Sequence, residues 1–142
     1  AFALDQQAHR DSVRRYRSLA DTLPALVVTT SVDGEIEDID EGYREYTGLT
    51  LAQARDWRNH TVIHPDDLEQ ATERWGEALR TGVPLQNEMR LRRHDGVYCW
   101  HLVQAKPIVD ADGAIQRWVT VSVDIEDRKR ADYLVYTISA KK

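Results

Sequence analysis

Three Asp-Gly pairs constrain the fold of this chain more than any other feature of its sequence. Each pair stands between runs rich in β-branched or alternating apolar residues, and the pairs occupy positions 33–34, 95–96 and 112–113. Asp-Gly between such runs is a strong β-hairpin signal, because glycine readily adopts the positive φ that a tight turn requires. The sequence therefore predicts antiparallel strands over residues 25–31, 35–39, 85–93, 97–108 and 114–125.

Helical patterns occupy the interval between the first hairpin and the second. Short helices are expected over residues 41–47 and 51–55, on either side of Gly48. A longer helix is expected to begin at Pro65, where proline suits the first helical position and two acids follow it, and to end at Gly82. Helices inserted within an antiparallel sheet are typical of an α+β domain rather than a parallel α/β one.

The length of 142 residues suits a single domain with flanking segments. Residues 1–23 are predicted as a flank with an amphipathic helix over 5–23, residues 24–125 as the core, and residues 126–142 as an exit linker that begins as a helix. No apolar run approaches the roughly 20 residues that span a bilayer. The single Cys99 excludes an intramolecular disulfide, so a cytoplasmic location is expected, although a parent protein could be membrane-anchored.

Charge and motifs exclude several functional classes. The net charge of −5 offers no basic excess to neutralise phosphates, which argues against nucleic-acid binding. The sequence has no nucleophile-and-base constellation and no Gly-rich phosphate loop. The domain itself is therefore not expected to be an enzyme.

A run near the C-terminus joins a strand directly to a helix. Residues 118–131 change at Asp124 from a β-branched strand to the charged sequence Ile-Glu-Asp-Arg-Lys-Arg. This run resembles the exit signature of PAS sensor domains. The resemblance extends over about residues 16–131 and also rests on Trp57, His64-Pro65-Asp66-Asp67, the run 88–96, Trp100 and Asp110.

The resemblance implies a PAS fold, a five-stranded antiparallel sheet with helices packed across one face. Such domains commonly precede histidine kinases, diguanylate cyclases or other output modules in bacteria. We therefore expect a sensory domain of a bacterial signalling protein, with a histidine kinase as parent and a covalently linked output domain. The alternative is a ligand-free dimerisation module that aligns output domains. Asp124 and Arg128 are expected to transmit the signal, because an acid before a helix can pair with a base one turn into it.

The orientation of the sheet decides which side chains face the helices. A two-residue loop at 95–96 would pair Arg90 with His101. Alternation alone would turn the more apolar face, which carries Met89 and Trp100, toward the long helix. The resemblance to light-oxygen-voltage domains implies the opposite orientation, in which His101 and the inward residues of the last strand look toward the helices.

The second orientation defines a candidate ligand site, formed by Glu88, Arg90, His101, Trp118, Thr120, Ser122 and Trp75. Such a site suits a small polar or anionic ligand, because Arg90 offers two parallel donors. The alternative is that Glu88 and Arg90 neutralise each other and the interior is simply filled. Thr120 stands where the family often has glycine, which would make a cavity smaller than usual.

The same orientation leaves an apolar outer face, formed by Leu91, Trp100, Leu102, Val119, Val121 and Val123. Large exposed apolar surfaces mark interaction sites. The amphipathic helix over residues 5–23, from the same chain or from a partner, is the expected cover, and the sequence thus predicts a homodimer.

No cofactor is predicted. A haem would need an axial histidine on the cavity-facing helix, and residues 66–80 contain none. Light-oxygen-voltage photochemistry needs a cysteine in the helical segment, where this chain has the run 57–61 without one. His60 and His64 are four residues apart, but the turn before Pro65 argues against a helical metal site, and His64 is expected to order that turn instead.

Overall fold

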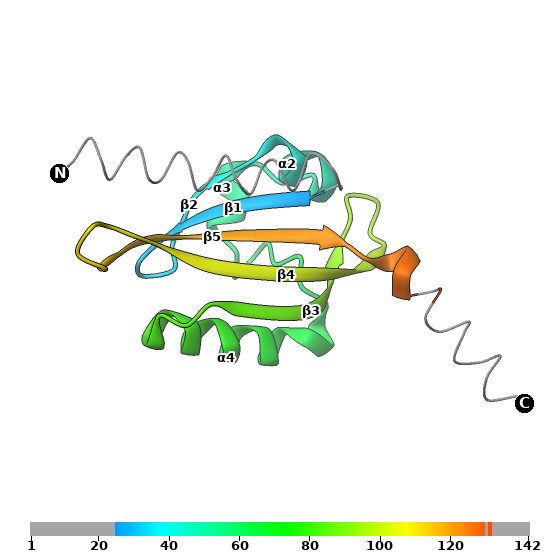
Figure 1. The fold of residues 1–142 in the computed structure, drawn as a ribbon. Helices are drawn as coiled ribbons and strands as arrows, with labels where there is room; N and C mark the ends of the chain where they lie inside the picture. The colour runs from blue at the N-terminus through cyan, green and yellow to red at the C-terminus, as the bar shows by residue number, and fades with distance from the viewer. Residues whose placement is uncertain (1–24, 130, 132–142) are drawn as a thin grey trace, which may run out of the picture.

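The computed structural model describes residues 25–129 and 131 and places them in one α+β domain (Figure 1). Its five strands are β1 (Ala25–Ser31), β2 (Ile36–Ile39), β3 (Leu85–Arg92), β4 (Tyr98–Val109) and β5 (Ile115–Asp124). They form one antiparallel sheet in the order β2-β1-β5-β4-β3, so the last strand of the domain lies at its centre. The predicted fold class is confirmed. The predicted flanking helix over residues 5–23 lies outside the described residues.

Three helices connect β2 to β3: α2 (Glu41–Thr47), α3 (Leu51–Arg55) and α4 (Pro65–Thr81). Glycines in the left-handed conformation end α2 and α4. His64 caps α4, because its Nδ1 accepts a hydrogen bond from the backbone N–H of Asp66 at 3.0 Å. The structural role expected for His64 is thus confirmed. In Figure 1, α4 runs beside β3 at one edge of the sheet, and α2 and α3 lie near β1 and β2.

The hairpin between β3 and β4 corrects the predicted register. The loop has three residues, since the N–H of Arg93 donates to the carbonyl of Val97 at 2.8 Å and Gly96 adopts φ +86°. Three-residue hairpin loops typically end with glycine in this conformation. Arg90 therefore lies opposite Trp100, and Met89 lies opposite His101. The shift by one residue moves every side chain of β3 to the other face of the sheet.

The inner face, on the side of the helices, holds the main core. Its principal cluster is formed by Leu26, Leu49, Val62, Ala71, Met89, Leu91 and Val103. His101 and Trp118 are almost completely buried on the same face, at 1% and 0% exposure. The orientation implied by the resemblance is therefore confirmed for β4 and β5, and the orientation favoured by alternation alone is wrong.

The outer face carries a separate apolar cluster, formed by Val27, Ile108, Val119 and Val121 with Ala25 and Val123 beside it. Trp100 and Leu102 share this face, as predicted, because they alternate with the inward residues of β4. Leu91 does not, since the corrected register places it in the inner core. Among the described residues, no helix is long and apolar enough to cross a membrane.

Candidate functional site

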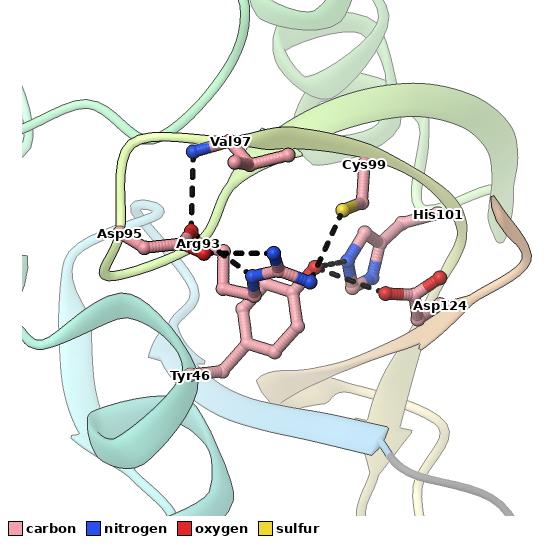
Figure 2. A network of polar contacts seen from close by, with 7 residues as sticks. All are labelled: Tyr46, Arg93, Asp95, Val97, Cys99, His101 and Asp124. Atoms are coloured by element: carbon pink, nitrogen blue, oxygen red, sulfur yellow. Dashed lines mark hydrogen bonds and ion pairs between the residues drawn. The ribbon is translucent and has the colours of Figure 1, made fainter.

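Three side chains from three elements meet where β5 ends (Figure 2). The hydroxyl of Tyr46, on α2, donates to Oδ2 of Asp124 at 3.1 Å. Nε2 of His101, on β4, lies 2.9 Å from the same hydroxyl, and the two rings meet edge to face. We call these three residues the exit network, because Asp124 is the last residue of β5.

The exit network has a defined direction of donation. Because the Tyr46 O–H donates to Asp124, its oxygen accepts the proton of His101 Nε2, which leaves His101 Nδ1 as an acceptor. That Nδ1 is buried and has no partner among the described residues. Burial lowers the pKa of His101, with Asp124 and Glu126 opposing the shift, so the ring is neutral. Burial above all, then Cys99 and Asp124, raise the pKa of Tyr46 well above its ordinary value, and the phenol keeps its proton.

A polar chain leads from Tyr46 to the β3–β4 hairpin (Figure 2). The Tyr46 hydroxyl contacts the thiol of Cys99, whose Sγ lies 4.0 Å from Nη1 of Arg93. Arg93 in turn forms a two-pronged ion pair with Asp95, at 2.7 and 3.0 Å. The guanidinium holds the pKa of Asp95 at about 2. Cys99 is a free, buried thiol on the inner face, where a cysteine packs as a small apolar residue.

Asp124 also holds the first turn after the sheet. Its second oxygen, Oδ1, accepts the backbone N–H of Glu126 at 2.9 Å. The N–H of Ile125 donates to the carbonyl of Trp100, and the carboxylate of Glu126 accepts the Trp100 N–H at 2.8 Å. We call residues 125–129 the exit turn. One carboxylate therefore joins the inner face of the domain to the exit turn.

The outer face contacts the exit turn through Trp100. The guanidinium of Arg90 lies 5.1 Å from the Trp100 ring, and the ammonium of Lys129 lies 4.9 Å from it. Lys129 also pairs with Glu88 at 2.6 Å. Arg90 is held by Asp67 of α4 through bonds of 2.8 and 3.0 Å, and this pairing lowers the pKa of Asp67. The outer face thus connects the start of α4 to the exit turn.

The structure separates the predicted ligand residues into two sets. Glu88 and Arg90 belong to the outer face, so the prediction that they share a site with His101 is wrong. The alternative, that the two neutralise each other, is wrong as well, because Glu88 pairs with Lys129 and Arg90 with Asp67. The cause is the extra loop residue before β4. His101, Trp75, Trp118, Thr120 and Ser122 all belong to the inner side. Trp75 of α4 packs edge to face on Trp118, with ring centroids 5.4 Å apart.

The predicted Asp124–Arg128 pair is not formed. Within the described residues, the partners of the Asp124 carboxylate are Tyr46 and the backbone of Glu126, whereas the Arg128 side chain is exposed. An acid at the cap position binds free backbone N–H groups, which is the commoner use of such a residue. The role of Arg128 in signal transmission stays a prediction.

Sequence reasoning missed Tyr46, Asp67 and Lys129. A tyrosine in a seven-residue helix carries no signal of its own. The usable signal was His101, because a polar ring on an inward strand position needs a buried partner. Among the described residues, no group of three His, Cys, Asp or Glu side chains could hold a metal ion.

Comparison with known proteins fixes the family. The sequence profile of a PAS fold family (PAS_3) matches residues 36–122. The chain belongs to the PAS family. The resemblance found in the sequence is thereby confirmed, and the PAS domain has the expected five-stranded sheet.

Similar proteins place this PAS domain among sensory proteins. It is 34% identical over 137 residues to the uncharacterized protein y4lL of Sinorhizobium fredii, covering 92% of this chain and 16% of that protein. It is 32% identical over 123 residues to the two-component sensor PprA of Pseudomonas aeruginosa, covering 82% and 13%. It is 30% identical over 123 residues to the peroxide stress-activated histidine kinase mak3 of Schizosaccharomyces pombe, covering 84% and 5%. The chain spans less than a fifth of each relative, and its role is that of a sensory signal-transduction domain.

Solved structures show the same fold. A sensory box histidine kinase/response regulator from Burkholderia thailandensis superposes with a TM-score of 0.67 at 16% identity, over 89% of this chain and 96% of that one. The light-oxygen-voltage domain of the blue-light photoreceptor Aureochrome1 gives 0.62 at 22% identity, over 92% and 94%. At these identities the comparison establishes the fold and leaves ligands to be argued from the residues.

Proposed function

We propose that this PAS domain senses a small molecule or a partner on its inner face and relays the change through Asp124 to a covalently linked output domain. The observation that carries the proposal is the double engagement of Asp124. One oxygen binds Tyr46, which belongs to the inner face, and the other caps the exit turn. A change that moves Tyr46 or His101 therefore alters the support of the exit turn, which shifts the population between two arrangements of sheet and exit.

The relatives support an output domain in the same chain. PprA and mak3 are long proteins named as a sensor and a histidine kinase, and this chain matches only a small part of each. The exit turn, directly after β5, is the natural point of attachment. The division of the chain into a flank, a core over 24–125 and an exit linker over 126–142 fits this arrangement. The free thiol of Cys99 fits a cytoplasmic domain.

We propose a sensor that works without haem or a photochemical flavin. The residues of α4 include no histidine, so the helix offers no axial ligand for haem iron. The only cysteine is on β4, beside Tyr46, rather than in the segment around α3 where light-oxygen-voltage photochemistry would require it.

A dimerisation module is the second candidate. It is favoured by the apolar outer cluster of Val27, Ile108, Val119 and Val121. All four side chains are buried, at 0–6% exposure, and side chains on the outer side of a sheet are buried only where another segment packs on them. We propose that the segment over residues 5–23, from the same chain or from a second copy, supplies it in a homodimer. Under this alternative, changes at Asp124 would leave the output unaffected as long as the dimer forms.

A chimeric sensor distinguishes the two candidates. This chain replaces the matched 123-residue segment of PprA, and the initial rate of phosphate incorporation from ATP is measured. Asp124→Ala is expected to change the rate at least threefold in either direction. Asp110→Ala is the matched control, because Asp110 caps the β4–β5 turn through the N–H groups of Asp112 and Ala114. Equal rates for Asp124→Ala, Asp110→Ala and the unmodified chimera would contradict the relay and favour the dimerisation module.

A further inference from the structure

Besides Nδ1 of His101 in the exit network, two buried polar atoms on the inner face have no partner among the described residues. They are Oγ1 of Thr30 and Nε1 of Trp118, in side chains exposed by only 5% and 0%. Thr30 and Trp118 are direct partners across the β1–β5 ladder, so both side chains rise from the same place on the same face. Buried donors and acceptors in folded proteins nearly always find a partner, because leaving one unpaired is costly. This end of the inner face is therefore chemically incomplete.

The neighbouring pair along the same two strands is not fully covered by the helices. Val28 and Thr120 lie opposite each other on β1 and β5, at the middle of the inner face. Both keep partial exposure, whereas the inward residues on either side of Thr120, Trp118 and Ser122, are buried. A central position of a covered sheet is ordinarily closed. The open position is thus adjacent to the two unpaired atoms.

The strand residues that line this region carry no charge. The inward residues of the two central strands from Leu26 to Thr30 and from Trp118 to Ser122 carry no ionisable side chain. Arg90, on which the expectation of an anionic ligand rested, is held by Asp67 on the outer side. An anion placed here would lose its hydration without gaining a cationic partner.

We propose that a neutral small molecule binds against Val28 and Thr120, accepting a hydrogen bond from Trp118 Nε1 and pairing with Thr30 Oγ1. The inference rests on the proposed sensory function and specifies the ligand class. The Trp118 N–H can only donate, so the molecule must present an acceptor such as a carbonyl oxygen. Thr30 can donate or accept, so it pairs with either an acceptor or an N–H of the same molecule. The rest of the molecule contacts the apolar surface of Val28.

Benzamide and benzoate test this class, since they share a shape and differ in charge. The full chain is labelled with ¹⁵N, and the indole N–H resonance of Trp118 is assigned by its loss in Trp118→Phe. Benzamide is expected to shift that resonance, and benzoate is expected to bind at least tenfold more weakly than benzamide. Thr30→Val removes the hydroxyl but keeps the shape, and should weaken benzamide binding about threefold to tenfold. Thr29→Val, one residue away on the outer side of the same strand, is the matched control and should leave the affinity unchanged.

Each other outcome overturns the proposal. Benzoate binding as tightly as benzamide would show an anion site. An indole resonance that neither probe moves, in variants whose spectra keep native dispersion, would mean that internal water alone satisfies the two atoms. If Thr30→Val and Thr29→Val weaken benzamide binding equally, the molecule does not bind at Thr30. None of these results bears on Asp124→Ala in the chimera, so failure of the ligand class and failure of the relay remain distinguishable.

Discussion

Replacing Tyr46 with phenylalanine is the most informative single change in the exit network. It deletes one oxygen that binds both Asp124 and His101, and it leaves the ring that packs against the inner core. Asp124 keeps its bond to the N–H of Glu126, but His101, with 1% exposure, then has no hydrogen-bond partner on either ring nitrogen among the described residues. A lost hydrogen bond costs about 1 kcal/mol and an unpaired buried donor about 1–3 kcal/mol. The expected loss in the free energy of unfolding is therefore about 3 kcal/mol.

The control is Tyr43→Phe, on the same helix and against the same core. Among the described residues the Tyr43 hydroxyl has no hydrogen-bond partner, so its loss should cost less than about 0.5 kcal/mol. Urea denaturation followed by circular dichroism gives both values, provided that the slope m is unchanged. A double variant with His101→Leu should recover at least about 1 kcal/mol relative to additivity, because both polar partners are then absent. Equal costs for Tyr46→Phe and Tyr43→Phe would refute the exit network as an energetic unit.

Two further predictions concern stability. Burial lowers the pKa of His101, so below about pH 6.5 the unfolded chain binds a proton that the folded chain does not. The free energy of unfolding should therefore fall as the pH drops from about 6.5 toward the pKa of His101 in the folded state. The expected slope is at most about 1.4 kcal/mol per pH unit. His101→Gln should flatten this part of the plot of urea midpoint against pH. Asp95→Asn should leave it unchanged, because Asp95, with a pKa of about 2, is ionised throughout this pH range. An unchanged plot in His101→Gln would contradict the assignment of this pH dependence to His101. Gly96→Ala should destabilise the domain by about 1 kcal/mol, because Gly96 has a φ of +86°. Gly76→Ala should stabilise it by about as much, because Gly76 lies in the middle of α4 with free space around its Cα. Shifts of the melting temperature with the same sign in both variants would show that backbone conformation does not decide the effect of these substitutions.

The sequence predicted the elements and the fold because their signals are local. Asp-Gly pairs, Pro65 and the glycines at 48 and 82 act within a few residues of themselves, and the structure places the strand and helix ends close to where they predict. The orientation of the sheet, by contrast, is not encoded by a local signal. Alternation alone favoured the wrong face, because the inner face of β4 carries His101 and Cys99 in place of larger apolar residues. The resemblance to a known family gave the right orientation.

The candidate site was predicted only in part, for two physical reasons. A hairpin loop of two or of three residues fits the same Asp-Gly pair, and the difference moved Glu88 and Arg90 to the opposite face. Asp124 was identified, but its partner was not, because Tyr46 is 78 residues away along the chain. Contacts between distant segments depend on the packing of helices on the sheet, which no short motif encodes.

The central claim is that Asp124 joins the inner face to the exit turn, and amide hydrogen exchange tests it most directly. The N–H groups of Glu126 and Lys129 are bonded to Asp124 Oδ1 and to the carbonyl of Ile125. In Tyr46→Phe, these two amides are expected to exchange faster by a larger factor than amides of the β4–β5 ladder remote from the exit, such as Ile108. Exchange at Glu126 and Lys129 that rises no more than at Ile108 would contradict the relay from Tyr46 through Asp124.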